Sequence, residues 1–441
     1  MDVLIKILQL LLSLSILVIF HEFGHFITAK IFKTRVEKFY LFFNPWFSIF
    51  KFRKGETEYG MGWLPLGGYV KISGMIDESM DKEAMKLPPQ PYEFRSKPAW
   101  QRLIIMLGGV TVNILLAIAI YVVMLAYWGE EYLPTSEANK YGIVCDSIAM
   151  EMGLQNGDKF LSIDNEPVED FSKIPITLIL NEAQSVQVER DGEIMNIQIP
   201  KGFVGKMIKR KTADFLFVRF PYEAGSFTKN AAGQAAGIKV NDKLLGINGQ
   251  SLPYFDQFAN ELKKYKNQII NITVLRGADT LVLEVNLPES GQIGVYVKPF
   301  SEYFTLSEKK YNLISAVPAG IAKAYNGIGD YLKQLKLLFS PEVKAYESVG
   351  GFITIGSIFP ATWDWENFWR LTAFLSIMLA ILNVLPIPAL DGGHVMFLLY
   401  EIIARRKPSD KFMEYAQVVG MVILFALLIF ANGNDIVKLF R

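Results

Sequence analysis

The sequence predicts a polytopic α-helical membrane protein with an inserted region of mixed α and β structure. Three observations predict this fold class. First, 51% of the 441 residues are hydrophobic, and the formal net charge is only +1. Second, four segments approach or exceed the length of about 20 apolar residues that a helix needs to cross a bilayer. Third, a long and more polar stretch separates the second segment from the third. The near-neutral charge gives no electrostatic reason to expect a nucleic-acid partner.

The four predicted transmembrane helices cover residues 1–35, 103–128, 366–403 and 415–433. The first could be mistaken for a cleaved signal peptide, but its apolar run is long and no small-residue cleavage pattern follows directly, so we expect an anchor. Basic residues are concentrated after the first helix and in the short loop between the third and the fourth, residues 404–414. Positive charges in short loops mark the cytoplasmic side, so both termini and the long polar stretch are expected outside.

The long polar stretch repeats itself. Residues 153–168, GLQNGDKFLSIDNEPV, align without gaps on residues 237–252, GIKVNDKLLGINGQSL, at an offset of 84. Self-similarity of this kind predicts two copies of one small domain, which we assign to residues 129–220 and 221–300. The shared pattern resembles PDZ domains, α+β modules that bind peptides by adding a strand to their sheet. The alternative is a β-rich spacer whose groove no longer binds a peptide.

Two further segments are expected to lie at the membrane. Residues 36–102 are predicted to be a cytoplasmic loop with a β-hairpin near residues 57–73, where four glycines suit tight turns. This hairpin is apolar enough to re-enter the membrane, where non-helical backbone is tolerated only if protein or a wet cavity covers it. Residues 301–365 are predicted to be a linker with an amphipathic helix at 318–339, which either lies along the membrane surface or packs against other helices.

The motif that carries chemistry is HEFGH, residues 21–25, within the first apolar segment. Ionisable groups at membrane depth cost about 2.5–3.5 kcal/mol each, so their presence needs a compensating interaction. In an α-helix His21 and His25 are one turn apart on one face and can reach the same ion, while Glu22 lies about 100° around the helix. H-E-x-x-H is the arrangement of zinc metalloproteases. The alternative is a pair of core or capping histidines beside an unrelated glutamate.

Zinc in such enzymes needs a third protein ligand and one open position. The sequence LNVLPIPALDGGH, residues 382–394, supplies the candidate Asp391, because an acidic side chain within an apolar segment is expected to be functional. Pro386 and Pro388 should break the third helix just before it. His394 is the alternative candidate for the third ligand. If Asp391 is the ligand, we expect His394 to interact with the ligands instead of with the metal. A cysteine-rich zinc site is excluded, since the chain has one cysteine.

HEFGH, the N-x-x-P-x-P-x-L-D-G-G motif that begins at Asn383, and the paired repeats together resemble the bacterial site-2 intramembrane proteases. The resemblance covers essentially the whole chain. It implies one zinc ion bound by His21, His25 and Asp391, with Glu22 as the catalytic acid and base. It also implies that the re-entrant hairpin adds a strand to the unwound substrate. Substrate contacts would then come from Asn383, Gly60, Gly62, Gly67, Gly68, Tyr69 and Val70.

The second span departs slightly from that family. Residues 108–113, GGVTVN, carry Val110 where the family often has proline, but they keep Asn113. This departure concerns local helix geometry rather than catalysis.

The same resemblance implies a zinc metalloendopeptidase of the bacterial inner membrane, with its termini and PDZ domains in the periplasm and its active site near the cytoplasmic side. Its substrates would be single-span membrane proteins, namely an anti-sigma factor already trimmed by a first protease in the envelope stress response, and remnant signal peptides. The PDZ pair would act as a size filter, and we expect a monomer in contact with the lipid bilayer.

Two other classes of function remain open. A PDZ scaffold with an idle metal site would require a ligand or the base to be missing, and none is missing from the sequence. A metal or proton transporter would favour ligands spread over several depths and spans rather than H-E-x-x-H beside one aspartate.

Overall fold

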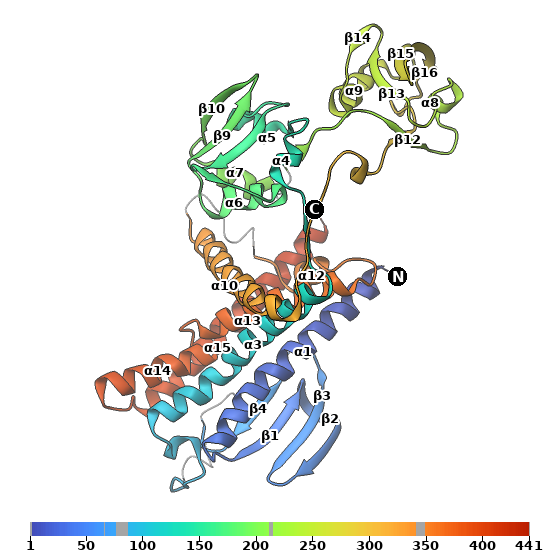
Figure 1. The fold of residues 1–441 in the computed structure, drawn as a ribbon. Coiled ribbons are helices and arrows are strands. Elements are labelled where there is room, and N and C mark those ends of the chain that lie inside the picture. The colour runs from blue at the N-terminus through green and yellow to red at the C-terminus, as the bar shows by residue number, and fades with distance from the viewer. Residues whose placement is uncertain (1, 66, 76–86, 211–214, 341–348, 441) are drawn as a thin grey trace. The chain divides into compact units, whose positions relative to one another are not determined.

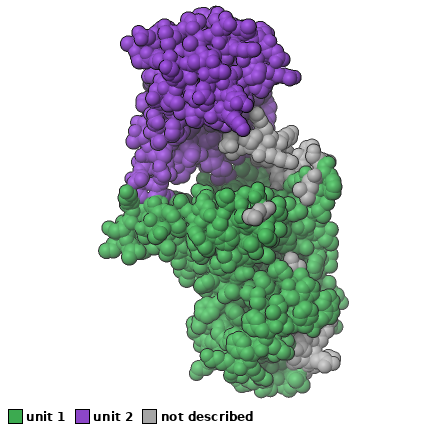
Figure 2. Space-filling view, turned by 90° about the vertical axis from the view of Figure 1, so that its right-hand side faces the viewer, with its two compact units in different colours: residues 1–129, 310–338, 344–441 green, residues 130–309, 339–343 purple. Residues whose placement is uncertain are grey.

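The structure is a computed structural model that describes residues 2–440 except for 66, 76–86, 211–214 and 341–348. The chain forms two compact units (Figure 2). The first consists of residues 1–129, 310–338 and 344–441, and the second of residues 130–309 and 339–343. The main stretch of the second unit, residues 130–309, begins and ends in a two-stranded sheet, in which β5 (Glu130–Tyr132) pairs with β18 (Ser307–Lys309).

The first unit is a helical bundle. Among the described residues, four of its helices are long and apolar enough to cross a membrane: α1 (Asp2–Ile31), α3 (Ala99–Tyr127), α13 (Trp365–Val384) and α15 (Asp410–Leu439). Each of the four predicted spans therefore coincides with a helix that is long and apolar enough to cross a membrane. The third is two helices, because α14 (Asp391–Ala404) begins only after the segment that contains both prolines, as the proline pair predicts.

Helix α3 lies at the centre of this bundle, with α1, α10, α13 and α14 packed against it (Figure 1). Helix α10 (Leu313–Leu338) packs on α3 through Gly320, where an added Cβ would lie 2.5 Å from a methyl carbon of Val122. A buried cluster joins α3, α10 and α13 through Tyr121, Ala324 and Ala373. The helix predicted at residues 318–339 is thus a packing helix of the bundle. The short helix α12 (Phe352–Ser357) follows it.

A four-stranded sheet follows α1 and contacts it through β1 and β4 (Figure 1). Its strands are β1 (Val36–Leu41), β2 (Phe43–Lys54), β3 (Thr57–Leu64) and β4 (Tyr69–Ile72), in the order β2-β3-β1-β4. The hairpin predicted at residues 57–73 is wrong in its pairing, since β1 lies between β3 and β4. The β1 strand pairs parallel with β3 and antiparallel with β4, burying Val36 and Tyr40. The actual hairpin joins β2 to β3 through Gly55, whose φ is +63°.

The second unit contains the predicted repeat. After the short helix α4 (Thr135–Ala138), the first copy comprises β6 (Ile143–Cys145), α5 (Ser147–Met152), β7 (Lys159–Ile163), β8 (Glu166–Pro167), α6 (Ile174–Leu180), β9 (Ser185–Arg190), β10 (Glu193–Gln198), α7 (Phe203–Arg210) and β11 (Leu216–Val218). The second comprises β12 (Ala224–Phe227), α8 (Ala232–Ala235), β13 (Lys243–Ile247), β14 (Gln250–Ser251), α9 (Phe255–Leu262), β15 (Ile269–Arg276), β16 (Asp279–Asn286) and β17 (Val295–Val297).

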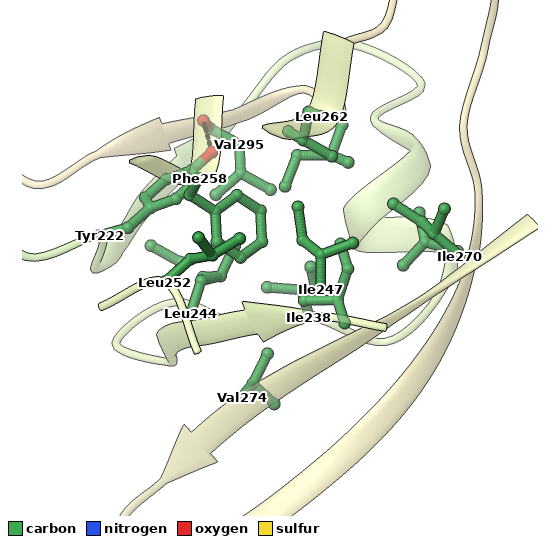
Figure 3. Close-up of a cluster of buried hydrophobic side chains, with 14 of the residues drawn as sticks. Tyr222, Ile238, Leu244, Ile247, Leu252, Phe258, Leu262, Ile270, Val274 and Val295 are labelled. Carbon is green, nitrogen blue, oxygen red and sulfur yellow. Dashed lines mark hydrogen bonds between the residues drawn. The ribbon is translucent and has the colours of Figure 1, made fainter. Parts of the chain in front are cut away.

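The two copies share their strand order. The sheets run β10-β9-β7-β8 and β16-β15-β13-β14, and β7 and β13 begin 84 residues apart, as the aligned sequences predict. Figure 3 shows the core of the second copy, in which Phe258 from α9 belongs to the same buried cluster as Leu244 and Ile247 from β13 and Val274 from β15. This core is made within the copy itself.

Each copy also contains a buried aspartate held by an arginine. Asp158 accepts two hydrogen bonds from Arg190, at 2.7 and 2.8 Å, and Asp242 accepts two from Arg276, at 2.8 and 2.7 Å. The same arginines donate to the carbonyls of Gly153 and Gly237, respectively, which are 84 residues apart. The copies are therefore equivalent in side-chain contacts as well as in strand order.

Candidate metal centre

Three side chains that are far apart in the sequence meet in the first unit. His21 and His25 project from α1, and Asp391 is the first residue of α14. The Oδ2 atom of Asp391 lies 3.1 Å from Nε2 of His21 and 3.2 Å from Nε2 of His25, and the two Nε2 atoms are 3.3 Å apart. The three atoms thus form a nearly equilateral triangle between two buried imidazoles and a carboxylate.

The size of this triangle fits a zinc ion. Zinc bonds of about 2.0–2.2 Å in a tetrahedron put neighbouring ligand atoms about 3.3–3.6 Å apart, close to the three separations observed. Two imidazole nitrogens and a carboxylate oxygen are also ligands that zinc takes in proteins. Among the described residues, this is the group in which three possible ligands converge. His394, the competing candidate, lies one turn further along α14 and lines the same cavity.

Asp391 is held in place by a tight turn before α14. The chain leaves α13 at Leu385 and folds back on the start of α14, so that an added Cβ on Gly392 would lie 2.1 Å from the Leu385 carbonyl oxygen. An added Cβ on Gly393 would lie 2.7 Å from Cα of Pro388. Ala389 has a φ of +79°. The two glycines after Asp391 are therefore required by the backbone, which must pass this close to itself to present the carboxylate.

The two histidines are placed by the close approach of α1 to α3. An added Cβ on Gly24 would lie 2.3 Å from the carbonyl oxygen of Gly108, so glycine on both helices lets the backbones touch. An added Cβ on Gly109 would lie 2.5 Å from Nε2 of His25 and 2.6 Å from Cε1 of His21. The backbone of α3 therefore lies directly against both rings and limits where they can move.

Three groups contact the ring nitrogens from neighbouring elements. Nδ1 of His25 lies 2.9 Å from the carbonyl oxygen of Ile105. Nδ1 of His21 lies 3.3 Å from the side-chain amide of Asn113, and its Nε2 lies 3.2 Å from the amide of Asn383. Asn383, predicted to contact the substrate, thus lies beside the cluster. Sequence reasoning missed the Ile105 contact, because a backbone carbonyl leaves no signature in the residue type, and it treated Asn113 only as a family feature.

A cavity of about 880 Å³ opens onto the cluster. Glu22 lines it together with the two histidines and Asp391, so the predicted base faces the same space as the predicted ligands. Gly68 and the first two residues of β4, Tyr69 and Val70, form part of its wall, and α15 contributes apolar residues that include Phe425. The cavity therefore joins the ionisable cluster to the last strand of the sheet.

The remaining predicted substrate residues lie apart from this wall. Gly60 and Gly62 are on β3, and added Cβ atoms there would lie 2.5 Å from the Tyr40 ring and 2.1 Å from the Phe43 carbonyl oxygen. These two glycines allow close packing inside the sheet. Gly67, with a φ of +133°, belongs to the turn that leads into β4. Of the six hairpin residues predicted, the structure brings Gly68, Tyr69 and Val70 to the cavity.

Comparison with known proteins identifies the family. The model of peptidase family M50 matches residues 9–427, nearly the entire chain. The chain belongs to peptidase family M50. The regulator of sigma E protease from Haemophilus influenzae is 27% identical to this M50 peptidase, over 97% of the chain and 98% of the relative. Proteins named "Putative zinc metalloprotease" from Treponema pallidum and Vibrio cholerae are 26% and 28% identical, each over 99% of this chain and the whole of the relative.

Membership of M50 fits the arrangement of this site. The histidines of the M50 peptidase project from α1 and lie against α3, two helices that are long and apolar enough to span a membrane. Its three converging ligand atoms, with a glutamate in the same cavity, make it suited to hydrolytic chemistry on a bound metal.

Proposed function

We propose that this M50 peptidase is a zinc metalloendopeptidase that cuts the transmembrane segments of single-span membrane proteins. His21, His25 and Asp391 would hold the zinc ion, and Glu22 would act as acid and base. The observation that carries the proposal is the triangle of ligand atoms, 3.1–3.3 Å on a side, beside Glu22 in one cavity among apolar helices. The names of the relatives, which specify zinc, support the choice of metal.

The chemistry follows from these groups. Zinc supplies Lewis acidity, which polarises a peptide carbonyl and makes water more acidic. Glu22 accepts the proton of the attacking water and passes it to the leaving amine. Asn383, whose amide is 3.2 Å from Nε2 of His21, holds the substrate backbone next to the reacting bond. The buried position of the histidines keeps bulk water from competing with the substrate.

Strand β4 is proposed to bind the substrate as an added strand. A substrate helix has all its amides paired, so the bond to be cut becomes accessible only after the helix unwinds. Pairing the unwound segment with β4 replaces the lost hydrogen bonds. Two features support this role. Strand β4 is at the end of the strand order of its sheet, and its residues Tyr69 and Val70, together with Gly68 just before the strand, line the cavity with Glu22.

The sheet that contains β4 is proposed to re-enter the membrane. Strand β2 exposes large apolar side chains, and Trp46 is 90% exposed. An exposed apolar surface of this kind is expected where a protein contacts lipid. The basic residues Lys51, Arg53 and Lys54 follow on the same strand and would reach the cytoplasmic lipid headgroups. The bilayer is thus a partner of the sheet as well as of the helices.

We also propose an inner-membrane topology with both termini in the periplasm. Lys6, near the start of α1, donates to the carbonyl of Ser357, and Asp435, near the end of α15, accepts from the backbone N–H of Thr354. Both ends of the chain therefore contact the region of α12. This supports the proposal that the two termini lie on the same side of the membrane. The basic loops predicted to be cytoplasmic are at the opposite ends of these helices, nearer the metal site.

The substrates we propose are an anti-sigma factor that a first protease has already trimmed, and remnant signal peptides. The relative named regulator of sigma E protease supports the first of these. The two equivalent copies of the second unit would be PDZ domains that act as a size filter, admitting substrates only after trimming. Their shared strand order and matching Asp–Arg pairs support a common fold for both. The enzyme is proposed to work as a monomer.

The decisive experiment uses Glu22→Gln in the full-length protein, reconstituted with a single-span substrate. We expect zinc content to stay at the wild-type level, because the metal ligands are untouched. Cleavage should fall by roughly 10²–10⁴-fold, the usual contribution of a general base. Undiminished cleavage would refute the role of Glu22. Normal zinc content with no cleavage even by the wild type, across many single-span proteins, would favour a scaffold or a transporter.

A further inference from the structure

Asn113 is a fully buried residue of α3 whose side chain faces the metal cluster. Its amide nitrogen lies 3.3 Å from Nδ1 of His21. Its amide oxygen has no hydrogen-bond partner among the described residues. Asn113 belongs to neither the set of ligands nor the general base, so its burial against a ligand histidine needs an explanation.

The explanation comes from the two nitrogens of each imidazole. A histidine that binds a metal through Nε2 carries its proton on Nδ1, and that N–H needs an acceptor. For His25 the acceptor is present, because Nδ1 is 2.9 Å from the carbonyl oxygen of Ile105. For Nδ1 of His21 the partner is the side-chain amide of Asn113, and only the oxygen of that amide can accept a hydrogen bond.

The contacts of His21 cannot all be donated hydrogen bonds. The amide nitrogens of Asn113 and Asn383 lie 3.3 and 3.2 Å from its two ring nitrogens, yet a neutral imidazole accepts at only one of them. Metal binding through Nε2 requires that Nε2 carry no proton, so the proton of the neutral ring is on Nδ1. The amide oxygen and nitrogen of Asn113 are close in size, so a half-turn about its last bond puts the oxygen beside Nδ1. After that rotation the amide oxygen has a partner and the amide nitrogen has none. The number of unpartnered ends stays the same, so the proton on Nδ1 decides which orientation the amide takes.

We propose that the Oδ1 atom of Asn113 accepts the Nδ1 proton of His21 and thereby fixes the tautomer that presents Nε2 to zinc. This inference rests on the proposed zinc site. Ile105, Gly109 and Asn113 are spaced four residues apart and so share one face of α3. One face of one helix therefore orients both histidines: Ile105 holds one ring, Asn113 holds the other, and Gly109 leaves room for both.

The test compares two substitutions in the full-length protein. Asn113→Leu keeps the branched shape of the side chain but removes the acceptor, whereas Asn113→Asp keeps an acceptor in the same place. The readouts are the zinc dissociation constant, from competition with a chelator, and the visible absorption of the cobalt-substituted protein. We expect Asn113→Leu to weaken zinc binding by roughly 10–100-fold, as loss of a ligand's hydrogen-bond partner does. Asn113→Asp should bind zinc as well as the wild type and keep its cobalt spectrum.

Ser376→Ala is the matched control for packing at this place. The Ser376 hydroxyl donates to the backbone carbonyl of Asn113 at 2.8 Å, so its loss disturbs α3 and leaves the amide side chain intact. We expect zinc binding within about threefold of the wild type, a difference that corresponds to less than one hydrogen bond. A weakening equal to that of Asn113→Leu would show that packing matters rather than the acceptor.

Two results would overturn the proposal. Wild-type zinc affinity in a folded Asn113→Leu protein would show that no acceptor is needed. Should that variant fail to fold, zinc binding by Asn113→Asp weakened more than tenfold would show that an acceptor is not sufficient. Neither result refutes the zinc site itself, which His21→Ala tests separately: retention of one tightly bound zinc in that variant would refute the proposed function.

Discussion

The metal centre is built around a partly buried carboxylate and each repeat around a fully buried one, but they assemble them over very different distances in the sequence. Asp391 lies within 3.2 Å of His25 although 366 residues separate them. Asp158 and Asp242 contact arginines only 32 and 34 residues away. In the repeats the charge is neutralised inside one small fold, whereas in the metal centre it depends on three separate helices packing correctly.

The difference shows where each region is vulnerable. In the repeats, backbone N–H groups at Gln155 and Lys239 also donate to the aspartates, so each carboxylate is fully satisfied by its own copy. In the metal centre, two imidazoles and a carboxylate face one another, and a bound ion would offset the cost of enclosing them. We therefore expect a substitution at the metal centre to reduce activity. A substitution in a repeat should destabilise that repeat and leave the rest of the protein unchanged.

The largest effect is expected from Asp391→Ala. This variant removes the only proposed oxygen ligand, so zinc content should fall from one ion per chain to near zero and cleavage should be lost. Metal analysis of the purified protein checks this. His394→Ala is the matched control and should keep its zinc. Full zinc occupancy in Asp391→Ala would instead assign the third position to His394.

The comparison also explains what could be predicted from sequence. H-E-x-x-H places two ligands by the geometry of one helix, and the offset of 84 residues exposes the repeat, so both regions leave local signals. Hydrophobic length was enough for the four spans, although α3 begins at Ala99 and α15 ends at Leu439, beyond the predicted bounds. Helices extend past the apolar run because polar residues at their ends continue the same hydrogen bonds.

What sequence could not predict are the contacts between distant segments. The glycine-rich run at residues 57–73 looked like a hairpin, yet β1, which precedes it by some 20 residues, pairs with both of its strands. Strand order depends on which pairing buries Val36 and Tyr40, and no local pattern records that. The contact of Asn113 with His21 was missed for the same reason, because it crosses between two helices.

A smaller effect on the metal centre is expected from Gly109→Ala. The added methyl carbon would lie 2.5 Å from Nε2 of His25 and must displace both rings from Asp391. A displacement of about 1 Å at a catalytic site can reduce the rate by roughly 100-fold, so cleavage should fall by about that factor while the protein still folds. Kinetics on a reconstituted substrate measure the effect.

Gly329→Ala is the control for Gly109→Ala. Gly329 also lies within a helix, α10, but an added Cβ there meets no heavy atom within 4 Å. Alanine favours helix over glycine, so this variant should cleave at the wild-type rate and be no less stable. Equal activity in the two variants would mean that the α3 backbone does not confine the histidines.

The smallest effect on activity is expected from Asp242→Asn, which tests whether a repeat is self-contained. Burial alone would raise the pKa of Asp242, but hydrogen bonds from Arg276 and from the backbone N–H of Lys239 outweigh it, so the pKa is lowered from the ordinary value of 3.8. A lowered pKa stabilises the fold above that ordinary value, and the contribution is lost as the pH falls through the folded value. Asparagine removes the charge at every pH.

Hydrogen–deuterium exchange of the full-length protein measures the effect of the substitution and the effect of acidification. In Asp242→Asn at neutral pH, exchange should rise in β13, β15 and β16, and should stay unchanged in β7 and β9 and in α1. Below pH 3.8, exchange corrected for the intrinsic amide rate at that pH should show less protection in the same strands of the wild type, with a smaller loss in the variant, because its carboxylate is already gone. Asp158→Asn should give the mirror result, with faster exchange in β7 and β9. Faster exchange in both copies from either single substitution would mean that the repeats fold as one cooperative unit. Each repeat would then depend on distant segments, as the metal centre does, and would not be self-contained.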